Sequence, residues 1–118
     1  MIMSRRPTTR KKRGEGSPPR FVPGQVVRHR RYGYRGVVVH VDTTCRADDN
    51  WYHKNLTQPG RNQAWYHVLV HASTGTTYAA EENLNGDDSG DPVSHPLVEM
   101  FFAGFQDGQY TRNDNPWG

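Results

Sequence analysis

The chain has 118 residues, which is enough for one domain. Only 33% of the residues are hydrophobic, and 12 are glycine and 8 are proline, so part of the chain is expected to stay unordered. No apolar run approaches the roughly 20 residues of a membrane span, and the polar first residues lack the apolar segment of a secretory signal. The single cysteine, Cys45, excludes a disulfide framework. Together these features predict a cytoplasmic protein. Residues 1–40 carry 11 of the 15 Lys and Arg and one acid, whereas residues 41–118 carry 11 acids, and this asymmetry predicts a polyanion partner for the basic part.

Residues 1–20 are predicted to form a disordered basic arm, because they contain seven cations, three prolines and almost no core-forming side chain. Such an arm can bind a phosphate backbone, with Arg10, Lys11, Lys12 and Arg13 as its densest run. Phosphate contacts carry no base information, so the arm is expected to add affinity without specificity. The same run resembles a nuclear-localisation patch, and the simplest alternative is a tail that only aids solubility.

Beyond the arm, β-branched and alternating residues predict strands over residues 25–30, 37–41, 63–72 and 76–80. Gly33 and Gly36 mark a tight connection between the first two strands, and residues 73–75 form a hairpin loop between the last two. Alternation along the second strand predicts one face with Val37, Val39 and Val41 and another with Val38, His40 and Asp42.

Two regions lack a strand pattern. Residues 43–62 show no sustained period, and their Trp51, Tyr52 and Leu56 are expected to pack on the body. A helix is predicted to begin at Pro96 and to end at Gly104 or Gly108. Its apolar stripe, expected to pack on the sheet, consists of Leu97, Met100, Phe101 and Phe105. Together these elements predict a mainly β fold, a small SH3-like, partly open β-barrel with one short C-terminal helix.

Three stretches resemble one known family: residues 23–42 (PGQVVRHRRYGYRGVVVHVD), 62–70 (NQAWYHVLV) and 77–84 (TYAAEENL). They are similar to the ordered motifs GQ-x-VRH…GY-x-GVV, W/F-YHV-x-V and Y-x-AEENL of the hemimethylated-DNA-binding, YccV/HspQ-like domain. The resemblance covers residues 21–106, between the arm and an irregular tail expected over residues 107–118. It implies a small β-barrel that binds DNA, with a preference for hemimethylated sites, and in bacterial heat-shock members assistance to an ATP-dependent protease.

The candidate DNA contacts of the fold bracket the first turn. They are Arg28, Arg30, Arg31 and Arg35, interleaved with His29, Tyr32 and Tyr34. Arginine can grip phosphate or pair with guanine, and tyrosine can stack on an exposed base. The alternative is a solvated strand edge, and we expect DNA contact from the arginines and core packing from the two tyrosines.

A protein-interaction adaptor, such as a specificity factor for an ATP-dependent protease, is the alternative function. Its contact surface would include Trp65, Tyr66, Glu81 and Glu82. The charge asymmetry favours DNA binding by the arm, while the acidic body weakens the case for DNA binding by the barrel. The oligomeric state stays open.

No enzyme, metal site or cofactor is predicted. The pair Glu81-Glu82 has no partner set for acid–base chemistry, and no phosphate-binding glycine loop is present. His67 and His71 lie four residues apart on a strand, roughly 13 Å, too far to share one ion. The remaining metal hypothesis, which we disfavour, is that His29, His40 and His67 meet across strands.

Overall fold

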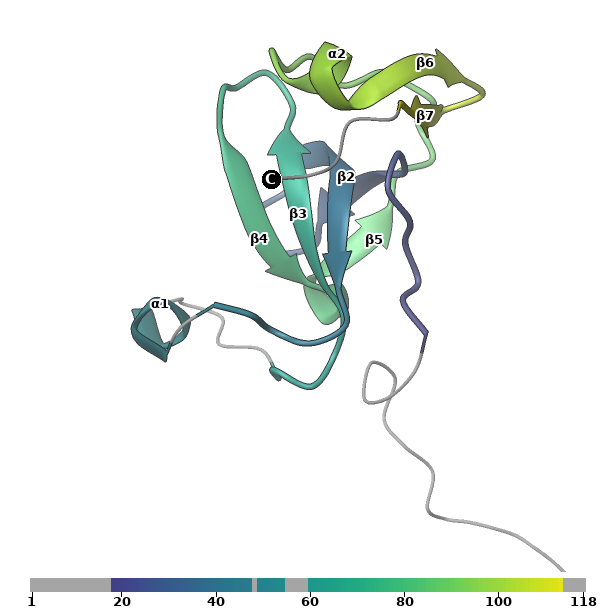
Figure 1. The fold of residues 1–118 in the computed structure, drawn as a ribbon. Helices are drawn as coiled ribbons and strands as arrows, with labels where there is room; N and C mark the ends of the chain where they lie inside the picture. Colours follow the sequence, from purple (N-terminus) through teal and green to yellow (C-terminus); the bar gives the residue numbers. More distant parts are fainter. Residues whose placement is uncertain (1–17, 48, 55–59, 114–118) are drawn as a thin grey trace, which may run out of the picture.

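The computed structural model describes residues 18–47, 49–54 and 60–113. Its largest unit is an antiparallel sheet with the strand order β4-β3-β2-β1-β5 (Figure 1). The strands are β1 (Val26–His29), β2 (Arg35–Asp42), β3 (Trp65–Val70), β4 (Thr76–Ala80) and β5 (Leu84–Gly86). Within the described ranges β4 and β5 are edge strands that do not pair with each other, so the sheet does not close. The predicted mainly β, partly open barrel is confirmed.

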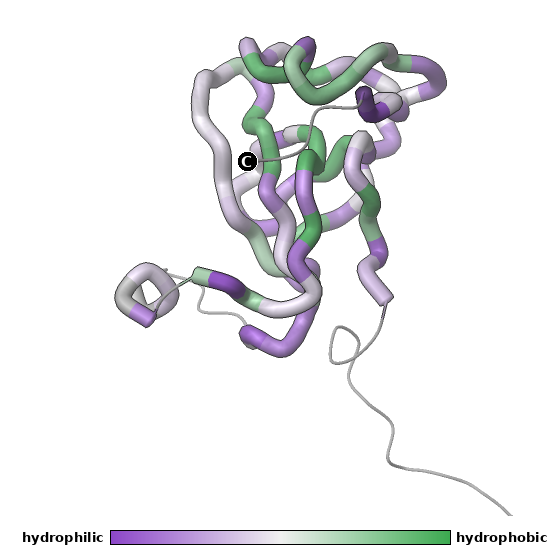
Figure 2. Tube along the Cα trace, viewed as in Figure 1, coloured by the Kyte–Doolittle hydropathy of each residue, from purple (hydrophilic) through white to green (hydrophobic). Residues whose placement is uncertain are grey.

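Two apolar clusters, formed by alternate side chains of the strands, hold the sheet together. The inner cluster contains Phe21, Val27, Val38, Ala64, Tyr66, Val68, Ala79 and Leu84. The outer cluster contains Val26, Val37, Val39, Leu69, Val93, Phe101, Phe102 and Tyr110, and so joins the sheet to the C-terminal segment. Figure 2 shows hydrophobic stretches in the central strands and in the C-terminal layer above them. Both faces of the small sheet therefore exclude water over part of their area.

A β-bulge in β2 changes which side chains share a face. The register of β2 against β3 shifts between Val38 and His40. Val37 and Val39 lie in the outer cluster, whereas Val41 packs against the inner one. The prediction that Val41 shares the face of Val37 and Val39 was wrong, because strict alternation requires an unbroken ladder.

Gly36 lies where two strands approach each other closely. A Cβ atom at this position would collide with the side chain of Val68 and the carbonyl group of Leu69. Glycine is therefore required here by space, whereas Gly33 in the preceding turn is favoured by its φ of 78°. The two glycines form the expected tight connection, but each is needed for a different physical reason.

The C-terminal segment forms a short helix followed by a hairpin. Helix α2 (Val98–Phe101) passes directly into β6 (Phe102–Gln106), which pairs with β7 (Gln109–Arg112). Between the two strands Asp107 and Gly108 have φ of 55° and 77°, as a tight two-residue hairpin turn requires. The Asp-Gly pair is a turn signal in the sequence, but the helical spacing of the apolar residues led to a predicted helix across part of this segment instead.

Two predictions about this segment need correction. The helix does not extend to Gly104 or Gly108, and Phe105, placed on its apolar stripe, lies in β6 and is 36% exposed. The irregular tail predicted over residues 107–118 was wrong for β7, which is a strand; residues 114–118 lie outside the described ranges. Packing of the short helix on the sheet is confirmed for Phe101, which is buried in the outer cluster, and for Leu97, which packs against it, but was wrong for Met100, which is 51% exposed.

The connection between β2 and β3 contains a short helix that the sequence pattern did not indicate. Helix α1 (Asp49–Lys54) places the Trp51 ring in edge contact with Trp65 at 6.0 Å. The guanidinium of Arg61 lies 4.7 Å above the Tyr52 ring and also donates to a carboxylate oxygen of Asp49 at 2.8 Å. The predicted packing of Trp51 on the body is therefore confirmed; Leu56 lies outside the described residues. Neither described helix is long and apolar enough to cross a membrane.

Candidate nucleic-acid interface

The end of the β1–β2 hairpin, residues 28–34, is here called the hairpin tip; it comprises the last two residues of β1 and the turn that follows. Its base is closed by hydrogen bonds from the N–H of His29 to the carbonyl of Tyr34 at 2.8 Å and from the N–H of Gly33 to the carbonyl of His29 at 2.9 Å. The Arg30 N–H donates to the carbonyl of Asn83 at 2.8 Å, which ties the tip to the segment before β5. The backbone of the tip is therefore fixed from two sides.

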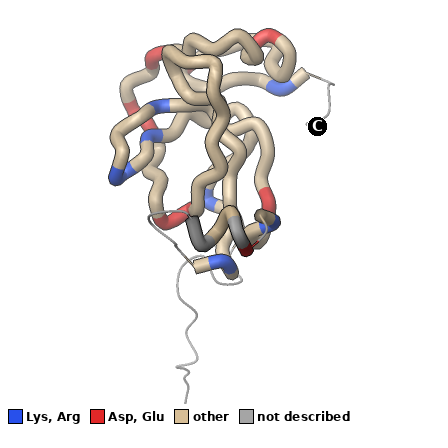
Figure 3. Tube along the Cα trace, turned by 90° about the vertical axis from the view of Figure 1, so that its left-hand side faces the viewer, with Lys and Arg blue, Asp and Glu red and all other residues tan. Residues whose placement is uncertain are grey.

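Three of the four predicted arginines present their guanidinium groups at the surface of this hairpin. Arg28 donates to the Gly33 carbonyl at 3.1 Å and lies 3.6 Å from a carboxylate oxygen of Asp87, but keeps 48% of its side chain exposed. Arg30 is exposed and donates to the Glu82 carbonyl at 3.1 Å. Arg31 is exposed, with its guanidinium carbon 5.9 Å from the Tyr32 ring centre. Figure 3 shows basic positions gathered on a protruding hairpin at one side of the molecule.

Arg35 has a different environment from the other three. Its guanidinium donates to Asp87 at 2.9 Å and to the carbonyl of Asp91 at 2.6 Å, and only 12% of its side chain is exposed. Burial would raise the pKa of the Asp87 carboxyl, but hydrogen bonds from Ser89 and Arg35 and the charges of Arg35 and Arg28 lower it below its ordinary value. Arg35 thus supports the hairpin from behind, and DNA contact by its guanidinium would require breaking these bonds.

The two tyrosines of the tip lie in different environments. Tyr34 is partly buried against the inner cluster, as predicted, and burial raises its pKa. Tyr32, also predicted to be a core residue, is instead 52% exposed. The reason is the turn itself, which directs Tyr32 outward and leaves one ring face stacked on His29 at 4.6 Å.

Three of the four residues predicted to contact a protein partner are buried. Trp65, Tyr66 and Glu81 are 1%, 0% and 2% exposed, so they cannot form a contact surface. Glu81 belongs to the short 3-10 helix η1 (Glu81–Asn83) and accepts hydrogen bonds from the Tyr66 hydroxyl and the Arg20 N–H, both at 2.8 Å. Burial and the Glu81 carboxylate raise the pKa of Tyr66 strongly. These residues fasten residues 20–21 to the barrel.

Glu82, the fourth residue, is exposed but structurally engaged. Its N–H donates to Oε1 of Gln63 at 2.9 Å, and its carboxylate accepts from the Gln63 amide and from the N–H of Gly60. Its carbonyl group accepts from Arg30, as described above. Glu82 thus supports the hairpin tip and the β2–β3 connection, whereas Glu81 holds residues 20–21.

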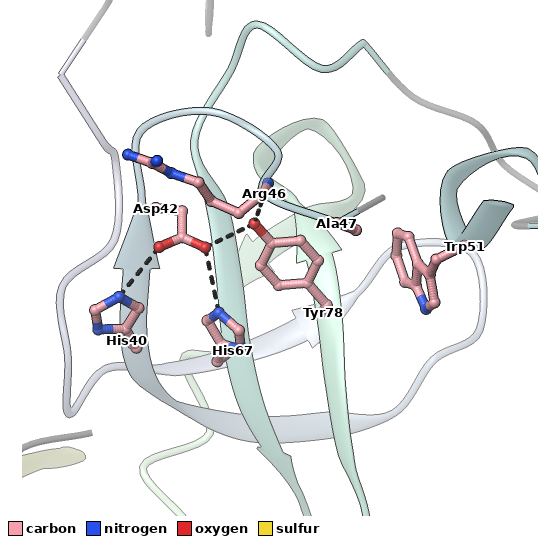
Figure 4. A pocket seen from close by; sticks show the side chains of 7 residues that line it. All are labelled: His40, Asp42, Arg46, Ala47, Trp51, His67 and Tyr78. Atoms are coloured by element: carbon pink, nitrogen blue, oxygen red, sulfur yellow. Dashed lines mark hydrogen bonds and ion pairs between the residues drawn. The ribbon is translucent and has the colours of Figure 1, made fainter. Parts of the chain in front are cut away.

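A polar pocket of about 410 Å³ lies at the far end of β2, β3 and β4 (Figure 4). It is lined by His40, Asp42, Arg46, Ala47, Trp51, His67 and Tyr78. One carboxylate oxygen of Asp42 lies 3.1 Å from Nε2 of His40, and the other lies 3.3 Å from Nε2 of His67 and accepts from the Tyr78 hydroxyl at 2.7 Å. The sequence placed His40 and Asp42 on one face of a strand and raised the possibility that His40 meets His67, but it did not indicate Tyr78 as their neighbour.

Hydrogen bonds within the pocket stabilise its carboxylate. Burial would raise the pKa of Asp42, but hydrogen bonds from Tyr78 and His67 and the nearby histidines lower it below its usual range. Burial lowers the pKa of His67, with the charge of Asp42 only partly opposing the shift. Burial and Asp42 raise the pKa of Tyr78 strongly. At neutral pH the ionised Asp42 carboxylate therefore accepts from a neutral His67 and a neutral Tyr78.

The metal hypothesis finds no support in the described ranges, where no group of three or more His, Cys, Asp or Glu side chains is arranged to hold an ion. His40 and His67 do meet across β2 and β3, with ring centres 5.4 Å apart. His29, by contrast, packs with Tyr32 and Tyr34 at the hairpin tip.

Comparison with known families agrees with this geometry. The model of the family described as "Hemimethylated DNA-binding protein YccV like" matches residues 19–109, most of the chain. This chain belongs to the YccV-like family. Among its relatives, F-box only protein 21 of Mus musculus is 35% identical and that of Homo sapiens 34% identical, each over 94 residues covering 76% of this chain. The YccV-like chain spans only 15% of the length of those relatives, so in them the matching region is a small part of a longer protein.

The structure gives a physical reason for the residue type at several motif positions of this YccV-like domain. Gly36 permits the close approach of β2 and β3, Glu81 accepts from a buried tyrosine, and Leu84 is fully buried. His29 in the VRH stretch accepts the N–H groups of Arg31 and Tyr32 through Nδ1. Most of the motif is therefore a scaffold that holds the hairpin tip in position.

Proposed function

We propose that this YccV-like domain binds DNA through its hairpin tip, with Arg28, Arg30 and Arg31 contacting the phosphate backbone. The observation that supports this most is the presence of three surface guanidinium groups at one end of the β1–β2 hairpin, two of them on its backbone-fixed turn. Side chains held on such a turn lose little freedom on binding, and each can neutralise one phosphate. Arg35 positions the turn through Asp87.

The basic arm would add affinity without specificity. Arg10, Lys11, Lys12 and Arg13 lie outside the described residues, so their role rests on charge alone. Seven phosphate contacts from the arm would give a log–log dependence of affinity on salt with a slope of about −6. A preference for hemimethylated DNA would have to come from the folded domain, because the arm cannot read bases.

The adaptor function has less support. Three of the four residues assigned to its contact surface are buried, and so an ATP-dependent protease as partner rests on the family resemblance alone. It would become the better proposal if the folded domain contributed nothing to DNA binding.

The test is fluorescence anisotropy with unmethylated, hemimethylated and fully methylated forms of one labelled duplex, at two salt concentrations. The full chain is compared with R30A/R31A, with a variant that has serine at residues 10–13, and with the combined variant. We expect R30A/R31A to weaken binding about tenfold or more at low salt, by losing two phosphate contacts. Arg46→Ala is the matched control, because it removes an exposed arginine away from the tip.

The residues 10–13 variant separates the two parts of the proposal. We expect it to lower the salt slope while any methylation preference persists. Binding that disappears entirely in this variant, with no effect of R30A/R31A in the full chain, would refute DNA contact by the tip.

A further inference from the structure

Three rings, here called the stack, contact one another in succession within the β1–β2 hairpin, with the outer pair stacked and the inner pair tilted. The His29 imidazole lies 4.6 Å from the Tyr32 ring at an interplanar angle of 21°, and 5.0 Å from the Tyr34 ring at 32°. Tyr34 fixes the inner end, since its ring packs on the inner cluster and its hydroxyl donates to Oγ1 of Thr77. The stack therefore begins in the core and ends at Tyr32, which is 52% exposed.

The outer ring is held in place before any ligand binds. His29 is 4% exposed, and its Nδ1 accepts the N–H groups of Arg31 at 3.1 Å and Tyr32 at 3.0 Å. These bonds require a lone pair on Nδ1, and therefore a neutral imidazole. Burial, followed by the charge of Arg31, lowers the pKa of His29 and so favours that neutral form. A ring presented in this way loses little conformational freedom when a ligand stacks on it.

The surroundings of Tyr32 fit both the base and the phosphate of a nucleotide. Its ring offers a flat aromatic surface, while Arg28, Arg30 and Arg31 supply positive charge from the same hairpin. The closest of these, Arg31, has its guanidinium carbon 5.9 Å from the ring centre, which is a loose contact. An isolated exposed aromatic residue needs no explanation, but a fixed ring among phosphate-binding cations matches the way proteins bind unstacked bases.

We infer that Tyr32 is a stacking site for one unpaired nucleobase, so that the hairpin tip prefers a single strand or a bulged base over a perfect duplex. The inference rests on the proposed function, because the arginines must first hold the phosphate backbone. Every internal base of a perfect duplex is already stacked on both faces, and exposing it costs energy, whereas an unpaired base has a face to offer. Since every base has a π-face, the site would discriminate little among bases.

The experiment uses the full chain with Arg10, Lys11, Lys12 and Arg13 replaced by serine, so that the arm does not mask the tip. Three labelled probes are compared by anisotropy: a perfect duplex, the same duplex with one bulged 2-aminopurine, and the single strand. We expect Y32A to weaken binding of the two unpaired probes about tenfold, and binding of the perfect duplex much less. Y32F should retain the preference, while Y32L, which keeps the side-chain bulk, should lose it.

Fluorescence of the bulged 2-aminopurine reports stacking directly, because this base is quenched when it stacks. Quenching should accompany binding by the parent and Y32F, and should be absent with Y32L. Equal affinity of the parent for all three probes, or equal losses on all three in Y32A and Y32L, would overturn the inference. If R30A/R31A still weakens binding in that case, the proposed function survives; if the parent binds no probe, both fail.

Discussion

The hairpin tip and the polar pocket are both rich in histidine, aromatic and charged side chains, yet they use them in opposite ways. In the pocket the carboxylate of Asp42 accepts from His67 and Tyr78 and lies 3.1 Å from Nε2 of His40, so it is already held by neighbours of the same domain. At the tip, the donors of Arg31 face solvent next to an exposed Tyr32.

Polarity alone therefore does not mark a binding surface. A carboxylate that is only 13% exposed and accepts from two neighbouring side chains stabilises the fold, because any ligand would have to replace bonds that already exist. An exposed guanidinium on a fixed turn gains bonds when a phosphate arrives. We therefore expect substitutions of hydrogen-bonded, mostly buried residues such as Arg35 and Asp42 to change stability, and substitutions of exposed residues of the hairpin tip such as Arg31 to change DNA binding.

The largest effect is expected from Arg35, the arginine that supports the hairpin from behind. Arg35→Ala should lower the free energy of unfolding by about 3 kcal/mol, because it leaves the nearly buried Asp87 without its main partner. Arg31→Ala, four residues earlier in the chain, should change it by no more than about 0.5 kcal/mol. Urea denaturation followed by tryptophan fluorescence measures both. Equal stabilities of the two variants would remove the distinction between supporting and exposed arginines.

The next largest effect is expected at the pocket. Asp42→Ala leaves the Tyr78 hydroxyl and the His67 ring without their acceptor and should cost about 2 kcal/mol of stability. Asp42→Asn keeps one acceptor oxygen and should cost less. Neither should change the salt slope of DNA binding when measured below the unfolding transition. A loss of stability without a difference between Ala and Asn would argue against the hydrogen bonds as the cause.

The sequence predicted the barrel better than the site, for reasons visible in particular residues. Strand positions followed from β-branched runs, such as the valines of β2, which are placed by local preference and burial. The position of Val41 was missed because a bulge is a property of two strands, and neither strand shows it alone. The β6–β7 hairpin was missed because Phe101 and Phe105 have helical spacing, although Asp107-Gly108 marked the turn.

The candidate site was predicted in part for a similar reason. A cluster of arginines near a glycine turn is visible in the sequence, but which of them is held by an acid depends on Asp87, more than 50 residues away. Likewise Glu81 and Tyr66 looked like surface candidates until the fold paired them in the core. Long-range partners decide whether a polar residue supports the fold or is available for binding.

A smaller effect is expected from acid. The pKa of His29 is lowered in the folded chain, by burial and by Arg31, so the unfolded chain takes up the proton more readily. Its contribution to stability is therefore complete above the ordinary pKa of about 6.5 and is lost as the pH falls from there towards the folded pKa. His29→Asn keeps an acceptor near the Nδ1 position and does not titrate, so its stability should fall less steeply below pH 6.5. Denaturation curves at a series of pH values measure the two slopes.

His67 acts in the same direction, since burial also lowers its pKa. Some acid sensitivity should therefore remain in His29→Asn. A slope identical to that of the parent would mean that protonation of His29 does not disturb the hairpin tip, and that the Nδ1 bonds to Arg31 and Tyr32 do not hold it.

The smallest effect is expected from Arg46, which lines the pocket. Its substitution tests whether the pocket takes part in DNA binding. Its side chain is exposed, and the contact that holds the loop, the bond from its N–H to the Tyr78 hydroxyl at 2.9 Å, uses the backbone and survives in Arg46→Ala. Stability should therefore change by no more than about 0.5 kcal/mol. If DNA binds at the tip, affinity should also change little, since one exposed charge away from the phosphates is screened by salt. A loss of affinity as large as that of Arg31→Ala would instead extend the DNA interface to the pocket, and the division between the two regions would no longer hold.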